Sequence, residues 1–156
     1  MKYWNQKDIP YACCQFITAI NARIFLGKEV DIIPSKIKED PDAQIFEVFV
    51  GLTGCRYGSC ISVKKAWRYL RLCGQYGPQA IDWIEDRLYE GRPVGIECYC
   101  PDYGFHSTLC IDANKDNLFM ANWEKGREYS KVPKNSIRMP INALWRPKAT
   151  AFSLRR

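Results

Sequence analysis

The feature of this sequence that most constrains its fold is a change in the spacing of apolar residues at Pro93. Before Pro93, apolar residues recur at the three- to four-residue period of an amphipathic helix. After Pro93, they alternate with polar residues, as in a strand with one buried face. This change predicts helices packed on a C-terminal antiparallel sheet, which is the α+β class.

Four helices are predicted before Pro93. The first ends at Gly27 and carries one apolar stripe, formed by Cys13, Ile17, Ile20 and Ile24. The other three are expected over residues 42–54, 62–74 and 78–91. The last two have ordinary boundary signals, because Ser62 can cap a helix start and Gly74 and Gly91 can end one.

Strands are predicted after Pro93, over residues 94–100, 106–112 and 117–123. The polar residues 113–116 between the last two have the composition of a hairpin turn. Two shorter closing strands are expected within 127–132 and 149–156. Since no repeat or linker interrupts the chain, we expect a single domain spanning residues 1–156.

Composition narrows the classes of partner. The chain has 156 residues, of which 47% are hydrophobic and 26% are charged, so it can bury one core. Its 23 basic and 17 acidic side chains give a net charge of +6, which allows an anionic partner. The basic residues are scattered and no nucleic-acid-binding motif is present, so nucleic acid is a disfavoured partner.

The eight cysteines raise the question of compartment and metal. The opening segment MKYWNQKDIP has no apolar stretch, and no run of 18 apolar residues occurs, so we expect neither a signal peptide nor a membrane span. A cytoplasmic location with reduced thiols follows, with a virion-associated location as an alternative. Cys98 and Cys100 are closer together than the cysteines of a usual zinc knuckle, and Cys55 and Cys60 remain a disfavoured zinc pair. No metal and no cofactor are expected.

His106 is the only histidine, so any acid–base chemistry through an imidazole must use it. The alternative is a surface or core histidine without a chemical role. If Asp112 pairs with Asp116, the hairpin register places His106 opposite Asn122, with Cβ atoms about 4.5–5.5 Å apart. At that separation, the asparagine side-chain oxygen can accept a hydrogen bond from the imidazole and orient it.

Two cysteines, Cys13 and Cys14, lie at a predicted helix start, where the thiol pKa is lowered. Cys13 belongs to the apolar stripe of its helix. Cys14 begins a more polar row one position round, formed by Thr18, Asn21 and Phe25. We therefore expect Cys14 to be presented to a cleft as the nucleophile and Cys13 to be packed, with Cys13 as the alternative nucleophile.

The order of these residues resembles that of the papain-like cysteine peptidases. In particular, CQFITAINARIFLG is similar to the nucleophile helix of the branch related to the double-glycine-leader peptidases of bacteriocin exporters. NQKDIPYAC resembles the glutamine segment of that branch, and HSTLCIDANKDNLFMANW resembles its histidine hairpin. Where that branch commonly has Asp-Pro, this chain has Asn122-Trp123, closer to the Asn-x-Trp of papain.

The resemblance implies a papain-like fold and a role for each matching residue. Cys14 would be the nucleophile, His106 the base and Asn122 the residue that orients the base. Gln6 would donate to the oxyanion, with Asn5 as an alternative donor. The implied activity is that of a thiol hydrolase, a peptidase or amidase, with a protein or peptide substrate as its partner. The alternative is a catalytically inactive papain-like binding or structural protein, such as a phage or bacterial assembly factor.

Overall fold

The computed structural model describes residues 2–9, 14–28, 56–61, 78–137 and 151–155. Its centre is a six-stranded sheet in which the strands lie in the order β1-β6-β2-β3-β4-β5. All five neighbouring pairs are antiparallel. The strands are β1 (Arg56–Ile61), β2 (Val94–Cys100), β3 (Gly104–Ala113), β4 (Asn117–Ala121), β5 (Tyr129–Pro133) and β6 (Ala151–Arg155). With the helices below, the α+β class is confirmed.

Two α-helices are described, α1 (Cys14–Phe25) and α4 (Pro78–Tyr89), and a short 3-10 helix, η2 (Lys134–Ser136), follows β5. Both α-helices end as the sequence predicts, at glycines with a left-handed backbone: Gly27 has φ +70° and Gly91 has φ +74°. At each end, the N–H after the glycine bonds a carbonyl five residues back, which satisfies helix-end acceptors. The helices predicted over 42–54 and 62–74 lie outside the described residues.

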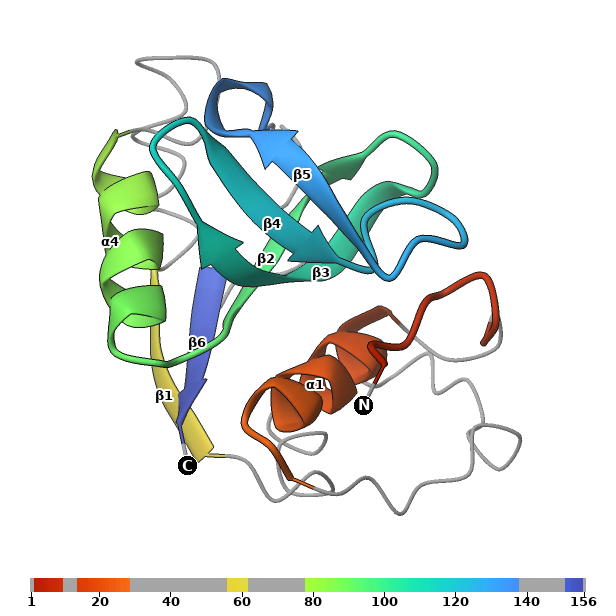
Figure 1. Ribbon diagram of the computed structural model, residues 1–156, viewed down its shortest axis with the longest axis horizontal. Coiled ribbons are helices and arrows are strands. Elements are labelled where there is room, and N and C mark those ends of the chain that lie inside the picture. Colours follow the sequence, from red (N-terminus) through yellow and green to blue (C-terminus); the bar gives the residue numbers. More distant parts are fainter. Residues whose placement is uncertain (1, 10–13, 29–55, 62–77, 138–150, 156) are drawn as a thin grey trace.

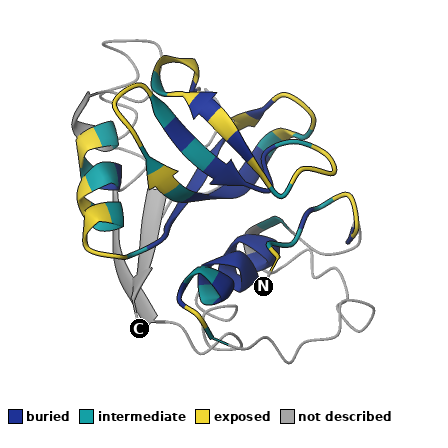
Figure 2. Cartoon of the chain, in the orientation of Figure 1, coloured by how far each residue is buried: buried dark blue, intermediate teal, exposed yellow. Residues whose placement is uncertain are grey.

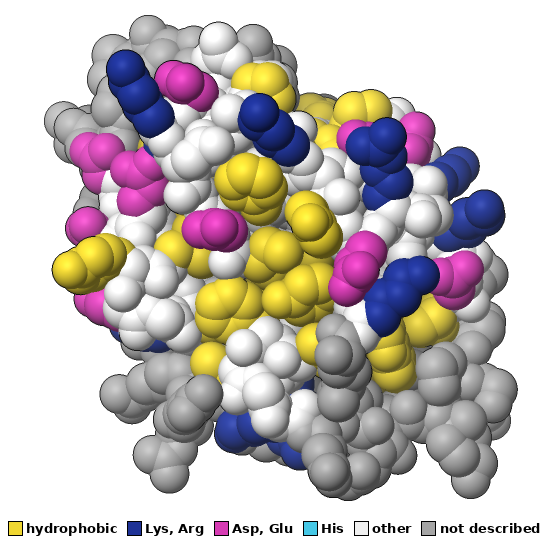
Figure 3. Space-filling view, viewed as in Figure 1, with side chains coloured by type: hydrophobic (Ala, Val, Ile, Leu, Met, Phe, Trp, Pro, Cys, Tyr) yellow, Lys and Arg dark blue, Asp and Glu magenta, His cyan; other side chains and the backbone are white. Residues whose placement is uncertain are grey.

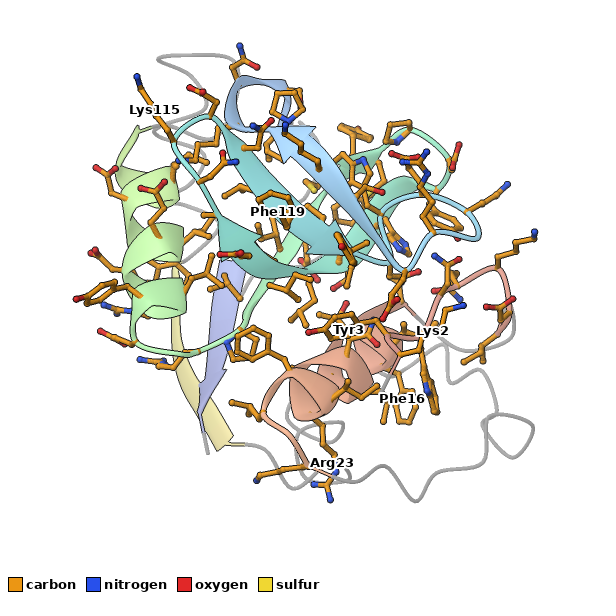
Figure 4. All side chains as sticks on the ribbon, in the orientation of Figure 1. Lys2, Tyr3, Phe16, Arg23, Lys115 and Phe119 are labelled. Carbon is orange, nitrogen blue, oxygen red and sulfur yellow. The ribbon has the colours of Figure 1, made fainter. Side chains whose placement is uncertain are left out.

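The two helices pack against opposite faces of the sheet (Figure 1). Ile84 of α4 belongs to the larger core cluster, together with Val94, Cys98 and Cys110 of β2 and β3. Ala22 and Leu26 of α1 form a second cluster with Leu109 and Ala121. Figure 4 shows Tyr3 beside α1, where it packs against this second cluster. Side chains of β3 therefore alternate between an α1 face and an α4 face.

Helix α1 is buried far more completely than one apolar stripe requires (Figure 2). The stripe residues Ile17 and Ile20 are fully buried, but so are Thr18 and Asn21 of the polar row. Thr18 Oγ1 lies 3.0 Å from Ser107 Oγ on β3, and the Asn21 side chain bonds both the N–H and the carbonyl of Trp4. The polar groups of Thr18 and Asn21 are therefore used in bonds to neighbouring segments.

The predicted strands are found, but the hairpin register is wrong. Leu109 pairs with Ala121 and Ala113 pairs with Leu118, with a bulge between Cys110 and Asp112. The turn closes later than expected because Asn114 Oδ1 accepts hydrogen bonds from the backbone N–H groups of residues 116 and 117. His106 is consequently not the cross-strand partner of Asn122, and β4 ends at residue 121. β1 was not predicted.

Candidate functional site

His106 lies near the start of β3 and is 4% exposed. Its Nε2 is 3.0 Å from the backbone carbonyl oxygen of Asn122. Since a carbonyl only accepts, Nε2 carries the proton, and Nδ1 is the ring atom that remains basic. Burial lowers the pKa of His106 to about 4, although the bond to Asn122 acts in the opposite direction. The imidazole is therefore neutral at pH 7.

The ring of Tyr103 covers this imidazole. The two ring centroids are 4.5 Å apart and the planes are inclined by 22°. Tyr103 comes from the turn between β2 and β3, and its hydroxyl donates a 2.8 Å hydrogen bond to Asn5 Oδ1. In Figure 3 no histidine atom is visible on the face shown, in keeping with the burial of His106. Tyr103 thus contributes to the burial that keeps the imidazole uncharged.

Asn122 contacts His106 through its main chain. The residue follows β4, is fully buried and has φ +61°. Its side-chain oxygen accepts a 2.6 Å hydrogen bond from the backbone N–H of Gln6. The predicted contact between Asn122 and His106 is present. The atom that bonds the imidazole is the carbonyl oxygen of Asn122, whereas its side-chain oxygen bonds the N-terminal segment.

Asn5 fixes that N-terminal segment to the loop after β4. Its buried amide group donates to the carbonyls of Glu124 and Arg127, at 2.8 Å each. Its side-chain oxygen accepts from the Tyr103 hydroxyl and from the backbone N–H groups of residues 7 and 126. Both amide protons are used in these bonds, so Asn5 serves as an anchor and is unsuited to the alternative role of oxyanion donor.

Gln6 is held next to Asn122 by its backbone N–H. Its side-chain amide donates a 3.0 Å hydrogen bond to the Ile9 carbonyl. An amide group carries two protons, and the bond to Ile9 uses one of them. The segment from residue 10 to residue 13, which joins Gln6 to α1, lies outside the described residues, as does the alternative nucleophile Cys13.

Cys14 is the first residue of α1 and is half-buried. The other cysteines whose side chains are described, Cys98, Cys100 and Cys110, are free thiols that are all buried. The hydrogen bond between Cys98 and Cys100 together with burial raises the pKa of Cys98, and burial raises the pKa of Cys110 to about 12. Cys14 is thus the most accessible of these four thiols, and a helix N-terminus favours its thiolate.

Cys14 and His106 lie toward the same end of the sheet. Helix α1 runs along β3 in the direction of that strand, since Thr18 meets Ser107 and Ala22 clusters with Leu109. Cys14 is one helical turn before Thr18, at the level of the first residues of β3.

The two residues lie on different faces of β3. Ser107 faces α1, so the preceding residue, His106, points to the α4 face, where its cross-strand partner is Cys98. Within the described residues there is no hydrogen bond between His106 and Cys14. The structure brings His106, Asn122 and Gln6 together, and it places Cys14 at the same end of the sheet but across β3.

Tyr103 and Asn5 complete the site, and neither role was predicted from sequence. The position of Tyr103, three residues before the only histidine, was the available signal. Within the described residues, no group of three or more histidine, cysteine or acidic side chains is placed to hold a metal ion.

None of the protein-family models, curated proteins or solved structures with which the chain was compared matches it. Nor does any helix of the described residues have the length and apolar character needed to cross a bilayer.

Proposed function

We propose that this chain is a thiol hydrolase of papain-like fold that acts on a peptide or amide bond. The observation that carries the proposal is the state of His106: its Nε2–H is held by Asn122, so Nδ1 is left as a base at the end of the sheet where Cys14 begins α1. The neutral imidazole has a lone pair on Nδ1 that can accept the proton of a thiol. Because burial lowers its pKa to about 4, the transfer requires a nearby thiolate to stabilise the imidazolium.

In the proposed reaction, Cys14 transfers its proton to Nδ1 of His106 and its sulfur attacks the substrate carbonyl carbon. The Cys14 backbone N–H stabilises the oxyanion, and the Gln6 side-chain amide is the second proposed donor, which must exchange a present hydrogen bond for the oxyanion. The C–N bond then breaks as His106 returns the proton to the leaving amine, and a thioester remains on Cys14. Water, deprotonated by His106, hydrolyses the thioester and regenerates the thiol. Cys14 and His106 lie on different faces of β3. The proton transfer between them therefore requires the two side chains to approach each other when substrate binds.

Two further features support the papain-like reading. The proposed nucleophile begins a helix packed against an antiparallel sheet, and the proposed base lies near the start of a strand that this helix contacts. The free thiols of Cys14, Cys98, Cys100 and Cys110 accord with a reducing compartment such as the cytoplasm.

The test is alkylation with iodoacetamide between pH 6 and 8, followed by peptide mapping of all eight cysteines. We expect Cys14 to react at least tenfold faster than Cys98, Cys100 and Cys110, because those thiols are buried. The matched variant His106→Ala should slow alkylation of Cys14 and leave the three buried thiols unchanged. Uniform slow labelling, or selective labelling of Cys13, refutes the assignment of Cys14 as the nucleophile.

The second candidate is a non-catalytic binding or structural protein. The observation that favours it is the orientation of His106, which is stacked on Tyr103 on the sheet face opposite α1. In such a protein His106 is a core residue with a satisfied Nε2–H. The labelling experiment separates the two candidates, because only the hydrolase predicts that His106→Ala changes the reactivity of Cys14.

A further inference from the structure

Asn122 has the one non-glycine left-handed backbone within the described segments, with φ +61°. This conformation is unfavourable for most L-residues because of the Cβ atom, and asparagine tolerates it better than most. The residue is fully buried at the end of β4, so the surrounding structure fixes the conformation. Unfavourable backbone conformations that are fixed by their surroundings often position functional groups.

The conformation directs two acceptor atoms of one residue at two different segments. The carbonyl oxygen lies 3.0 Å from Nε2 of His106 on β3. The side-chain oxygen lies 2.6 Å from the backbone nitrogen of Gln6. The side-chain amide nitrogen is buried and has no hydrogen-bond partner among the described residues. An amide side chain that oriented the imidazole would use its oxygen for that purpose, and here the oxygen bonds Gln6.

We propose that Asn122 is a positioning residue that holds His106 through its main-chain carbonyl and holds the Gln6 segment through its side chain. On this proposal, residue 122 must have a left-handed backbone. A bond between the Asn122 side-chain amide and the imidazole is not required. One residue thereby sets the spacing between the base and the segment that carries the oxyanion donor. The relevance of this positioning to catalysis rests on the proposed function. The hydrogen bond between the Asn122 carbonyl and His106 is independent of that function.

Two substitutions separate the main-chain role from the side-chain role. Asn122→Gly removes the side chain and keeps free access to positive φ, so the carbonyl stays on His106. Asn122→Ala removes the same hydrogen-bonding atoms but disfavours positive φ. Both variants lose the bond to the Gln6 N–H. A side-chain role for Asn122 toward His106 predicts that the two variants behave alike, whereas the main-chain role predicts that only alanine disturbs the imidazole.

The measurement is NMR of the His106 ring, which gives one pair of ring-nitrogen signals because the chain has one histidine. We expect the wild type to show a protonated Nε2 whose N–H exchanges slowly with water. In Asn122→Gly this N–H resonance and the His106 pKa should be retained. In Asn122→Ala the N–H should exchange roughly five- to thirtyfold faster, the factor that corresponds to the usual cost of a left-handed L-residue.

Equal behaviour of the two variants overturns the proposal, as does a wild-type ring protonated at Nδ1. If the alanine variant does not fold, the glycine variant decides alone, because loss of its Nε2–H resonance contradicts the main-chain role. For the hydrolase, kcat should fall in Asn122→Gly and fall little further in the double variant with Gln6→Ala, since both changes act on one segment. Failure of Cys14 labelling refutes the proposed function and leaves the ring measurement standing, so the two failures are distinguishable.

Discussion

Lowering the pH from 7 to 5 should destabilise this protein through its one histidine. The unfolded imidazole has a pKa of 6.5, whereas burial lowers the pKa of folded His106 to about 4. Between these two values the unfolded chain binds more protons than the folded chain. Unfolding therefore becomes easier as the pH falls, and the stability is fully present above pH 6.5.

The magnitude follows from the two pKa values. At pH 5 the unfolded imidazole is almost fully protonated and folded His106 is about one-tenth protonated, so the loss relative to pH 7 is about 2 kcal/mol. The loss of stability approaches about 3 kcal/mol below pH 4, because each unit of difference between the two pKa values corresponds to about 1.36 kcal/mol. Folded proteins commonly have 5–15 kcal/mol of stability, so a loss of this size shifts a denaturation midpoint measurably.

The assay is urea unfolding at pH 7, 6 and 5, with His106→Gln as the matched control. Both proteins carry the same carboxyl groups, so the difference between their free energies of unfolding isolates the imidazole. We expect this difference to change by about 2 kcal/mol between pH 7 and pH 5. A difference that stays constant, or a His106 pKa near 6.5 by NMR in the wild type, refutes the reasoning from burial.

Two further predictions concern the residues that enclose His106. Tyr103→Ala should expose the imidazole and raise the His106 pKa from about 4 toward 6.5, whereas Tyr103→Phe keeps the ring contact and should leave that pKa near 4. An unchanged NMR titration in Tyr103→Ala would show that other groups bury the ring. Asn5→Ala removes five hydrogen bonds of a buried side chain and should cost about 2–4 kcal/mol in urea unfolding. A loss below about 0.5 kcal/mol would contradict the anchoring role.

Much of the described secondary structure could be predicted because it depends on local signals. Helix α1 and helix α4 follow from apolar spacing, and each ends at a glycine that adopts the left-handed conformation. The strands after Pro93 follow from alternation. β1 escaped prediction, since a six-residue strand whose partner β6 lies some 90 residues later in the chain carries little signal of its own.

The site could be predicted only in part. The sequence brings His106 and Asn122 together correctly, because both lie on one hairpin. It does not give the register, which depends on how Asn114 closes the turn and on the bulge before Asp112. The prediction that the Asn122 side-chain oxygen bonds the imidazole was consequently wrong, because the carbonyl oxygen makes this contact. The assignment of Cys14 as a nucleophile stays a prediction.

The sequence by itself determined the α+β class, the ends of α1 and α4, and the identity of the one histidine. Those properties depend on residue type and on spacing within one element, where neighbours along the chain supply the signal. Tertiary structure alone decided that His106 is buried beneath Tyr103, that it faces away from α1, and that Asn122 reaches it through a carbonyl. The reason is physical: burial, sheet face and hydrogen-bond partner depend on contacts between segments distant in sequence.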